Sequence, residues 1–385
     1  MKCKLSDICD FRKGKVEVEN LNTKNYISTE NMLPNKSGIT EATSLPKASS
    51  TQEYKNGDVL VSNIRPYFKK IWQARYDGGC SNDVLVFVPK STTDRDFLYY
   101  LLADDDFFTY SMATSKGTKM PRGDKASIMQ YEVPMVDFCT QKKIASVLKS
   151  LDEKIELNNA INENLLEQAS ALFDNALKQS ESISFVELSS LADVKGGKRL
   201  PKGVNLITKP NSHPYIRVRN LNNMIFASLS SDYEYVDDET QKSIARYITS
   251  AGDVLVSIVG TIGLTAIVDD TLNNANLSEN CVKLTNLKGI TPEYLLLFLR
   301  SKIGVESINK GIVGAVQLKL PIKNIQSIPV PLLMSVEMQA LSDILSIMFN
   351  RISSNIIETQ RLSELRDVLL PKLMSGEIDV SNLDL

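Results

Sequence analysis

Basic side chains gather in three stretches of the sequence that hold few or no acidic residues. The segments Ser62–Arg75 and Lys195–Arg219 contain no carboxylate, and Lys116–Lys125 contains only Asp124. DNA phosphates bind such patches with release of counterions, and Arg, Asn and Gln can also read base edges in the major groove. The three stretches together therefore indicate nucleic-acid binding.

The candidate DNA-binding residues are basic side chains of these stretches and one glutamine in a glycine-led loop of the second half of the chain. They are Arg65, Lys69, Lys70, Lys119, Arg122, Lys198, Arg199, Arg217, Arg219 and Gln317. For any single lysine-rich loop, simple solvation is the alternative. Tyr67, Phe68 and Trp72 lie among the basic residues of the first stretch, and they fit a hydrophobic core as well as a stacking surface.

Motifs of several enzyme classes are missing from the sequence. A single histidine, His213, argues against histidine-based zinc sites and against a Ser-His-Asp triad. Neither a G-x-x-x-x-G-K-[ST] phosphate loop nor the Asn/Asp-Pro-Pro-aromatic element of an adenine methyltransferase is present. The sequence Gly260–Gly263, GTIG, we interpret as a turn between strands. We therefore expect a non-catalytic chain without a metal site.

Composition places the chain among ordinary globular proteins. Its 385 residues are 43% hydrophobic and 23% charged, which predicts two or more domains with ample cores. The net charge is −2, so any nucleic-acid binding must come from local patches. Five cysteines without a C-x-x-C pair indicate reduced thiols in a cytoplasm. Because no apolar run is long enough to cross a bilayer, we expect no membrane association.

The candidate residues belong to a sequence that occurs twice. GDVLVS is identical at Gly57–Ser62 and Gly252–Ser257, and reads as a turn that leads into a buried strand. Short predicted strands and helices follow in the same order in both halves. The chain is therefore a tandem repeat with a unit of about 190 residues, each a mixed α/β globule followed by a long helix.

The long helices are predicted at Gln141–Leu177 and Met338–Met374, where apolar residues alternate in steps of three and four. The residues of this apolar seam are Ile144, Leu148, Leu151, Ile155, Leu341, Leu345, Met348 and Ile352. Asn158 and Asn355 interrupt it at matching positions, where a polar residue can fix the register of a coiled coil. One such helix alone would be interpreted as packed on a core, but two matching copies favour pairing with each other.

Connectivity requires that the two helices run antiparallel if they pair. The predicted fold class is an α/β (α+β) tandem repeat: two mixed α/β globules separated by a long antiparallel two-helix coiled coil, with pseudo-two-fold symmetry. The expected boundaries are 1–140 and 181–337 for the globules, and 141–180 and 338–385 for the helices and the C-terminal tail. Each helix of roughly 55 Å exceeds one turn of B-DNA, about 34–36 Å, so this layout predicts a split DNA site whose spacing the helices set.

At this point the sequence resembles a known family. The tandem arrangement, the two GDVLVS segments, SNIRPYF at Ser62, YIRVRNL at Tyr215, and the long helices that follow Val133–Pro134 and Val330–Pro331 are similar to the specificity (S) subunit of type I restriction–modification enzymes. The resemblance extends over essentially the whole chain.

The resemblance implies two target-recognition domains, each of which reads one half of a split, asymmetric sequence in double-stranded DNA. It implies that the helices dock two methyltransferase (M) subunits, which use S-adenosylmethionine to methylate adenine. Restriction (R) subunits then join and cleave DNA with ATP and Mg, so this chain itself binds none of these cofactors. The alternatives are a self-contained methyltransferase or nuclease, which the missing motifs disfavour, and a duplicated protein–protein adaptor, which the basic patches disfavour.

Overall fold

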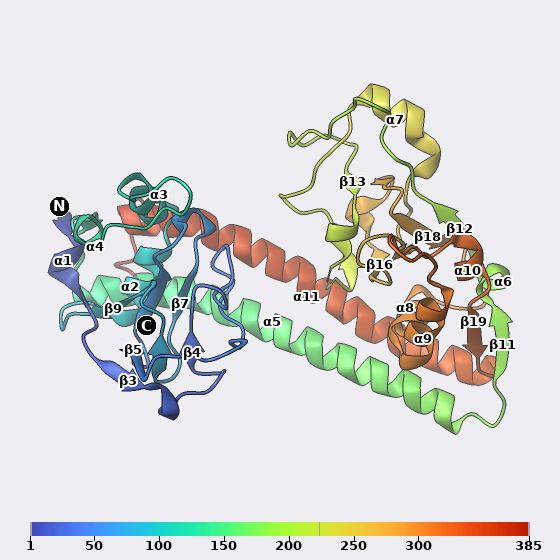
Figure 1. The fold of residues 1–385 in the computed structure, drawn as a ribbon, viewed down its shortest axis with the longest axis horizontal. Helices are drawn as coiled ribbons and strands as arrows, with labels where there is room; N and C mark the ends of the chain where they lie inside the picture. The colour runs from blue at the N-terminus through green and yellow to red at the C-terminus, as the bar shows by residue number, and fades with distance from the viewer. Residues whose placement is uncertain (1, 223, 384–385) are drawn as a thin grey trace. The chain divides into compact units, whose positions relative to one another are not determined.

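The computed structural model describes residues 2–222 and 224–383 (Figure 1). The chain divides into two compact units, Met1–Leu157 with Glu358–Leu385, and Asn158–Ile357. Each unit contains a mixed helix-and-sheet globule and one half of each of two long helices, α5 (Phe138–Gln179) and α11 (Ser335–Ser375).

The first unit begins with a strand that pairs with the last strand of its globule, β1 with β10, so that the globule closes before α5 begins. Its elements are β1 (Lys2–Lys4), α1 (Leu5–Ile8), β2 (Cys9–Phe11), β3 (Lys15–Glu17), β4 (Tyr26–Ile27), β5 (Ser50–Tyr54), β6 (Val59–Ser62), β7 (Ile71–Gln73), β8 (Gly78–Cys80), β9 (Val84–Pro89), α2 (Arg95–Ala103), α3 (Asp105–Ala113), α4 (Lys125–Ile128) and β10 (Glu132–Pro134). The strand orders are β2-β9-β6-β7 and β3-β5-β8-β4.

The second unit repeats this plan. Its elements are β11 (Ser184–Glu187), α6 (Leu188–Leu191), β12 (Asp193–Gly196), β13 (Tyr215–Ile216), β14 (Phe226–Ala227), α7 (Asp238–Ile244), β15 (Val254–Ser257), β16 (Thr265–Val268), β17 (Asn276–Leu277), β18 (Cys281–Thr285), α8 (Pro292–Arg300), α9 (Lys302–Gly311), α10 (Ile322–Gln326) and β19 (Pro329–Leu332). The order β12-β18-β15-β16 matches β2-β9-β6-β7, the pair β11-β19 matches β1-β10, and the parallel pair β13-β17 matches β4-β8.

The repeated GDVLVS segment has a physical reason at each position. Gly57 and Gly252 adopt positive φ angles of 92° and 83°, which glycine tolerates without strain. The aspartate that follows is buried in both units and accepts a backbone N–H from the residue three positions earlier. The Val-Leu-Val run then forms the buried strands β6 and β15.

Each buried aspartate also forms an ion pair, but with a partner from a different element. Asp58 pairs with Arg12, which follows β2, whereas Asp253 pairs with Lys283 of β18 at 3.2 Å. The two units therefore share the turn and the strand. The buried aspartate carboxylate requires a cationic partner, and each unit supplies that partner from a different element.

In the first unit, the long helices pack on the globule as well as on each other. Ile144 and Leu148 of α5 and Leu370 of α11 lie in the same buried cluster as Phe97 of α2. The carboxylate of Asp152 joins the same three helices, because it accepts hydrogen bonds from Tyr100 of α2 at 2.7 Å and from Arg366 of α11 at 2.8 Å. Burial opposes the charge on Arg366, yet its hydrogen bonds with Asp152 raise the pKa of the guanidinium.

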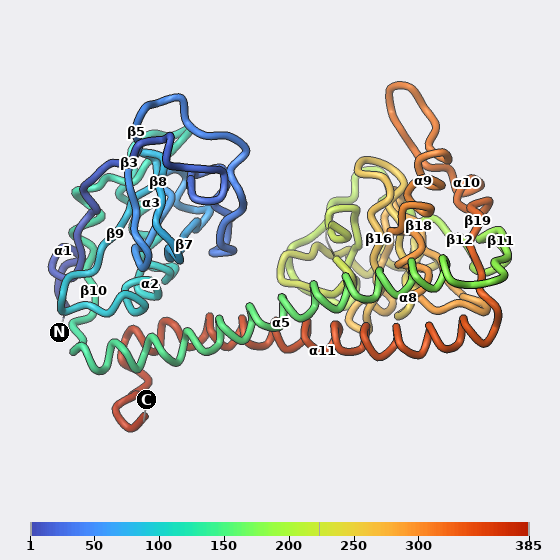
Figure 2. Tube along the Cα trace, turned by 90° about the horizontal axis from the view of Figure 1, so that it is seen from below, coloured from blue at the N-terminus to red at the C-terminus, as the bar shows by residue number. Residues whose placement is uncertain are grey.

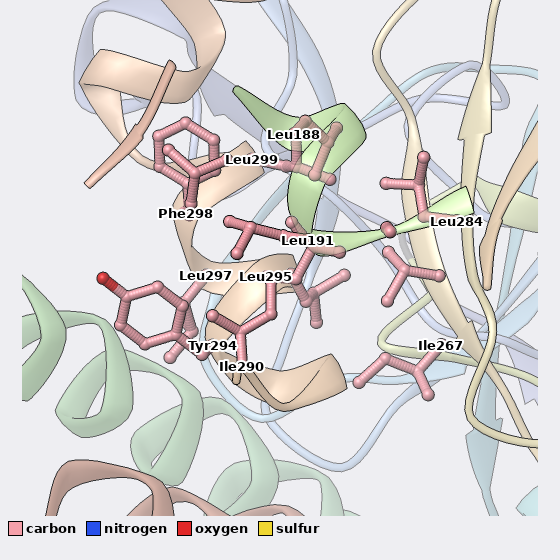
Figure 3. Packing of buried hydrophobic residues seen from close by; sticks show 14 of the residues in the cluster. Leu188, Leu191, Ile267, Leu284, Ile290, Tyr294, Leu295, Leu297, Phe298 and Leu299 are labelled. Carbon is pink, nitrogen blue, oxygen red and sulfur yellow. The ribbon is translucent and has the colours of Figure 1, made fainter. Parts of the chain in front are cut away.

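In the second unit, the core lies between the sheet, helix α8 and both long helices (Figure 3). Helix α8 begins with Pro292 after the capping residue Thr291, and its residues Tyr294–Leu299 are all buried. The ring of Tyr294 lies 5.0 Å from that of Phe173 of α5, and its hydroxyl donates to the carbonyl of Pro331. The second globule thus packs on the part of α5 that belongs to its own unit.

The predicted antiparallel course of the helices is confirmed within each unit (Figure 2). In the second unit, Asn162 contacts Asn355 and Ser180 contacts Glu337. Higher residue numbers along the first segment thus pair with lower numbers along α11, as antiparallel helices require. Among the predicted seam residues, the buried ones are Ile144, Leu148, Leu341, Leu345, Met348 and Ile352, and the half-buried ones are Leu151 and Ile155. Most of these residues belong to buried clusters that also include residues of a globule, and their role in helix pairing stays a prediction.

The predicted fold class, a tandem repeat of mixed α/β globules with two long antiparallel helices, is confirmed. The arrangement of the globules about the helices, their pseudo-two-fold relation and the domain boundaries stay predictions.

Candidate nucleic-acid interface

Two of the basic stretches of the first unit meet at a β-hairpin. Lys116 and Arg122 exchange backbone hydrogen bonds of 2.8 and 3.0 Å, and Arg122 also bridges to Ile64. The N–H of Arg65 donates to the carbonyl of Pro121 at 2.8 Å. The loop after β6 and the hairpin Lys116–Arg122 thus form one continuous surface.

The loop after β6 holds two basic residues in a strained backbone conformation. Arg65 and Lys69 have φ angles of 52° and 50°, and they flank the short 3₁₀ helix Pro66–Phe68. For residues other than glycine, this left-handed conformation costs about 1–2 kcal/mol each, and such strain clusters at functional sites. The equivalent of Arg65 in the second unit is Gly260, with a φ of 81°, where the strain is absent.

The aromatic residues of this loop divide into two classes. Tyr67 is 49% exposed and Phe68 is 37% exposed, and their ring centroids lie 4.7 Å apart. Trp72 is buried in a core cluster. The geometry therefore makes Tyr67 and Phe68 available for stacking and assigns Trp72 to the core.

Two of the predicted basic residues of the first unit, Lys69 and Arg122, are held by carboxylates that are distant in sequence. Lys69 pairs with Asp105 at 2.7 Å, and the same carboxylate holds Lys36 at 2.8 Å. Arg122 pairs with Asp83 at 2.9 Å. These stretches contain few acidic residues of their own, but carboxylates from other segments lie beside them in the folded structure.

Lys70 and Lys119 differ in how available they are. The ammonium of Lys70 donates to the carbonyl of Thr29 at 2.6 Å, and burial lowers its pKa. Lys119 lies exposed at the tip of the hairpin. Of the two, Lys119 has the better geometry for a phosphate contact.

The second unit carries a hairpin of the same length, Val313–Lys319, which projects between α9 and α10 (Figure 2). Val313 and Lys319 exchange hydrogen bonds of 2.9 and 3.0 Å, and Lys319 bridges to Val259 as Arg122 bridges to Ile64. Gly314 has a φ of 107°, and a Cβ there would lie 2.5 Å from the carbonyl oxygen of Gln317. The tip, including Gln317, is exposed.

A basic pocket lies on the second globule, apart from the hairpin in sequence. Arg199, Arg217 and Arg219 line a hollow of about 460 Å³ together with Glu279. Arg199 pairs with Glu279 at 2.8 Å, and Arg217 and Arg219 both pair with Glu234. Three of the predicted residues are therefore brought together in one place.

Lys198 adjoins this pocket through its backbone. Its N–H donates to Leu277 at 2.8 Å and its carbonyl accepts from the Tyr215 hydroxyl at 2.8 Å. Its ammonium lies 5.5 Å from the ring centroid of Tyr247, a cation–π contact.

The residues that the sequence argument missed are mainly acidic. Asp83, Asp105, Glu234 and Glu279 hold the predicted basic side chains, and Lys36 joins the Asp105 cluster. Local sequence carries little signal for these pairs, since Arg199 and Glu279 stand 80 positions apart.

Comparison with known proteins shows to which family the chain belongs. A family model described as the type I restriction modification DNA specificity domain matches residues 1–167 and again residues 181–366. The chain belongs to this family. The match occurs twice, in agreement with the structural repeat.

Individual relatives of this specificity family match over most of the chain. The HindI specificity subunit of a type I restriction enzyme from Haemophilus influenzae is 23% identical, over 92% of this chain and 94% of that protein. The MjaIX specificity subunit from Methanocaldococcus jannaschii is 21% identical, over 77% and 72%. The crystal structure of the S subunit of a type I restriction–modification system from M. genitalium superposes with a TM-score of 0.60, at 17% identity, over 97% of this chain and 96% of that one. At this identity the superposition supports the fold.

Within 2–222 and 224–383, no group of three His, Cys, Asp or Glu side chains is placed to hold a metal ion. No helix of that part of the chain is long and apolar enough to span a bilayer. Burial raises the pKa of the thiols of Cys9, Cys80 and Cys281 to about 12, so these cysteines are poor nucleophiles.

Proposed function

We propose that this chain is the DNA sequence-recognition subunit of a type I restriction–modification complex, in which each globule reads one half of a bipartite, asymmetric site. The observation that carries the proposal is the pair of hairpins, Lys116–Arg122 and Val313–Lys319. They have the same length, the same backbone hydrogen bonds and the same contact to the strand-end loop. Family membership agrees with this role.

The two hairpins differ in side chains while they share a backbone. Between the matching glycines and the closing basic residue, the first has Thr-Lys-Met-Pro and the second has Ala-Val-Gln-Leu. A conserved frame with different exposed side chains suits two globules that bind different sequences, since base edges are read by side chains and not by the hairpin backbone.

The long helices are proposed to dock two methyltransferase subunits. Helix α11 exposes Ile347, which is 71% accessible, and Val336, which is 80% accessible, in the second unit, and Val368, which is 56% accessible, in the first. Large exposed apolar side chains of this kind favour protein contacts. In the proposed complex, the methyltransferase subunits carry S-adenosylmethionine, and restriction subunits carry ATP and Mg. This chain contributes no catalytic residue, and the complex acts in the cytoplasm.

A gel-shift titration tests the proposal. The purified chain should bind a random duplex weakly and in a salt-sensitive way, and the complex with its cognate methyltransferase subunit should bind one sequence specifically. Sequence-specific methylation by the chain alone would instead support a self-contained enzyme. A complex that forms without any duplex binding would support an adaptor.

A further inference from the structure

One carboxylate in the basic pocket occupies two of its arginines. Glu234 pairs with Arg217, and its Oε2 lies 2.9 Å from Nη2 of Arg219. Glu234 and Arg217 are partly buried, at 25% and 34% exposed, whereas Arg219 is exposed. The most favourable acceptor position between the two guanidinium groups is therefore already filled by the protein itself.

The backbone that carries Glu234 is fixed. Tyr233 and Tyr235 on either side are buried, and the carbonyl of Glu234 accepts the N–H of Tyr215 at 2.9 Å. Release of the arginines therefore requires only a rotation of the Glu234 side chain. A change of this size is compatible with binding by an otherwise pre-formed surface.

The arginines keep an unmet capacity for an anion. The Nε–H of Arg217 is buried and makes no hydrogen bond with the residues that the structure describes. Burial and then the charge of Arg219 lower the pKa of Arg217. Both arginines border the hollow of about 460 Å³, into which an outside anion can enter.

We propose that Glu234 competes with DNA phosphate for Arg217 and Arg219. The inference rests on the proposed function. A phosphate that takes the place of the Glu234 carboxylate between the two guanidinium groups must first displace it, and this cost is the same for every duplex sequence. Glu234 therefore lowers the affinity of the chain for duplexes of any sequence, and a duplex that offers no further contacts is bound weakly.

The first unit contains a similar arrangement at a different position. Asp105 holds Lys36 and Lys69 at 2.8 and 2.7 Å, beside the strained loop that carries Arg65. Two cations share one carboxylate in both units, although the carboxylates come from unrelated elements.

The test is a titration of a fluorescent, random-sequence 30-base-pair duplex with the full chain, at several NaCl concentrations. Loss of a partly exposed ion pair in Glu234→Gln should tighten binding by about three- to fivefold. The plot of log K against log salt should steepen by about one, because no carboxylate is left to take up a cation when the arginines move to phosphate. Glu234→Asp keeps the negative charge but moves it away from the two arginines, because the side chain is shorter. It should change the affinity in the same direction, and it replaces Glu234→Gln in the test if that variant does not fold.

Two controls separate this effect from a general change of charge. Asp270→Asn removes one negative charge from an exposed position of the same unit, outside the basic stretches, and should leave binding nearly unchanged. Addition of Arg217→Met and Arg219→Met to Glu234→Gln should abolish the gain. A Glu234→Gln chain that binds no tighter than the parent, or no tighter than Asp270→Asn, would overturn the inference. If the parent chain and its complex with methyltransferase subunits bind no duplex at all, the proposed function fails as well.

Discussion

Asn355 of α11 donates a hydrogen bond from Nδ2 to Oδ1 of Asn162 of α5, over 2.8 Å. Both side chains are buried, so this amide pair lies within the contact of the two long helices. The sequence predicted a register-fixing role for Asn355 as a polar residue that interrupts the apolar seam. The structure supplies its partner, Asn162, which the heptad pattern alone did not single out.

The amide pair predicts a non-additive response to mutation. Asn355→Leu leaves the amide of Asn162 buried without its partner and should lower the free energy of unfolding by about 1–3 kcal/mol. The double change Asn162→Leu with Asn355→Leu should recover most of that loss, since two apolar groups replace two polar ones. Urea unfolding measures both. Asn350→Leu, at an exposed position of α11, is the control and should change stability by less than about 0.5 kcal/mol. Equal losses in the single and double variants would contradict the role of the pair.

The strained backbone at Arg65 predicts opposite effects on stability and binding. Arg65→Gly removes the cost of a left-handed non-glycine residue and should raise the free energy of unfolding, or leave it unchanged, with a gain of up to about 1 kcal/mol. The same variant should bind DNA more weakly. Asn35→Gly, at a φ of 55° in the adjoining turn, is the matched control and should leave DNA affinity unchanged. Unchanged affinity in Arg65→Gly would remove Arg65 from the interface.

The ion pair at the base of the first hairpin predicts that the thermal stability of the chain depends on pH. Hydrogen bonds from Lys116, and from the N–H and hydroxyl of Ser127, lower the pKa of Asp124 from 3.8 to about 2. A carboxylate with a lowered folded pKa contributes stability above its ordinary pKa, and that contribution is lost as the pH falls through the folded value. The difference in Tm between the parent and Asp124→Asn should therefore be constant above about pH 5 and shrink between about pH 4 and about pH 2. A difference that stays constant down to pH 3 would contradict this assignment.

The repeat, the order of its elements and the course of the long helices could be predicted because each depends on local pattern. Glycines at positive φ, Val-Leu-Val runs and seam periodicity act over a few residues, and both copies carry them. The sheet order could not be predicted, since it depends on pairings such as β2 with β9, which are remote in sequence. The sequence also did not show that Ile144 and Leu148 pack in one cluster with residues of the globule, because that depends on the folded structure.

Sequence analysis identified the basic residues of the candidate interface but not the acidic residues that pair with them. Basic residues cluster along the sequence, so their stretches could be identified. Their carboxylate partners arrive from other elements, as Glu234 does for Arg217 and Arg219. Absence of acid within a stretch therefore did not imply absence of acid around it.

The two hairpin tips predict different kinds of contact. Lys119→Met should weaken binding equally for all sequences and reduce the slope of log K against log salt by about 0.9, as expected for one lost phosphate contact. Gln317→Ala should instead reduce discrimination at one base position by about 1–3 kcal/mol and leave the salt slope unchanged. Titrations against target and single-mismatch duplexes distinguish the two effects. A salt-slope change in Gln317→Ala without loss of discrimination would contradict base recognition by that residue.

The central claim is that each globule reads its own half of one DNA site. The most direct test maps methylated adenines across the genome of cells that express this chain with its methyltransferase partner. The parent chain should direct methylation to one bipartite motif. A variant in which the residues of Gly314–Leu318 are replaced by those of Gly117–Pro121 should alter one half of the motif and leave the other half and the spacer unchanged. A motif that is unaffected by this exchange, or methylation that does not depend on this chain, would contradict the account.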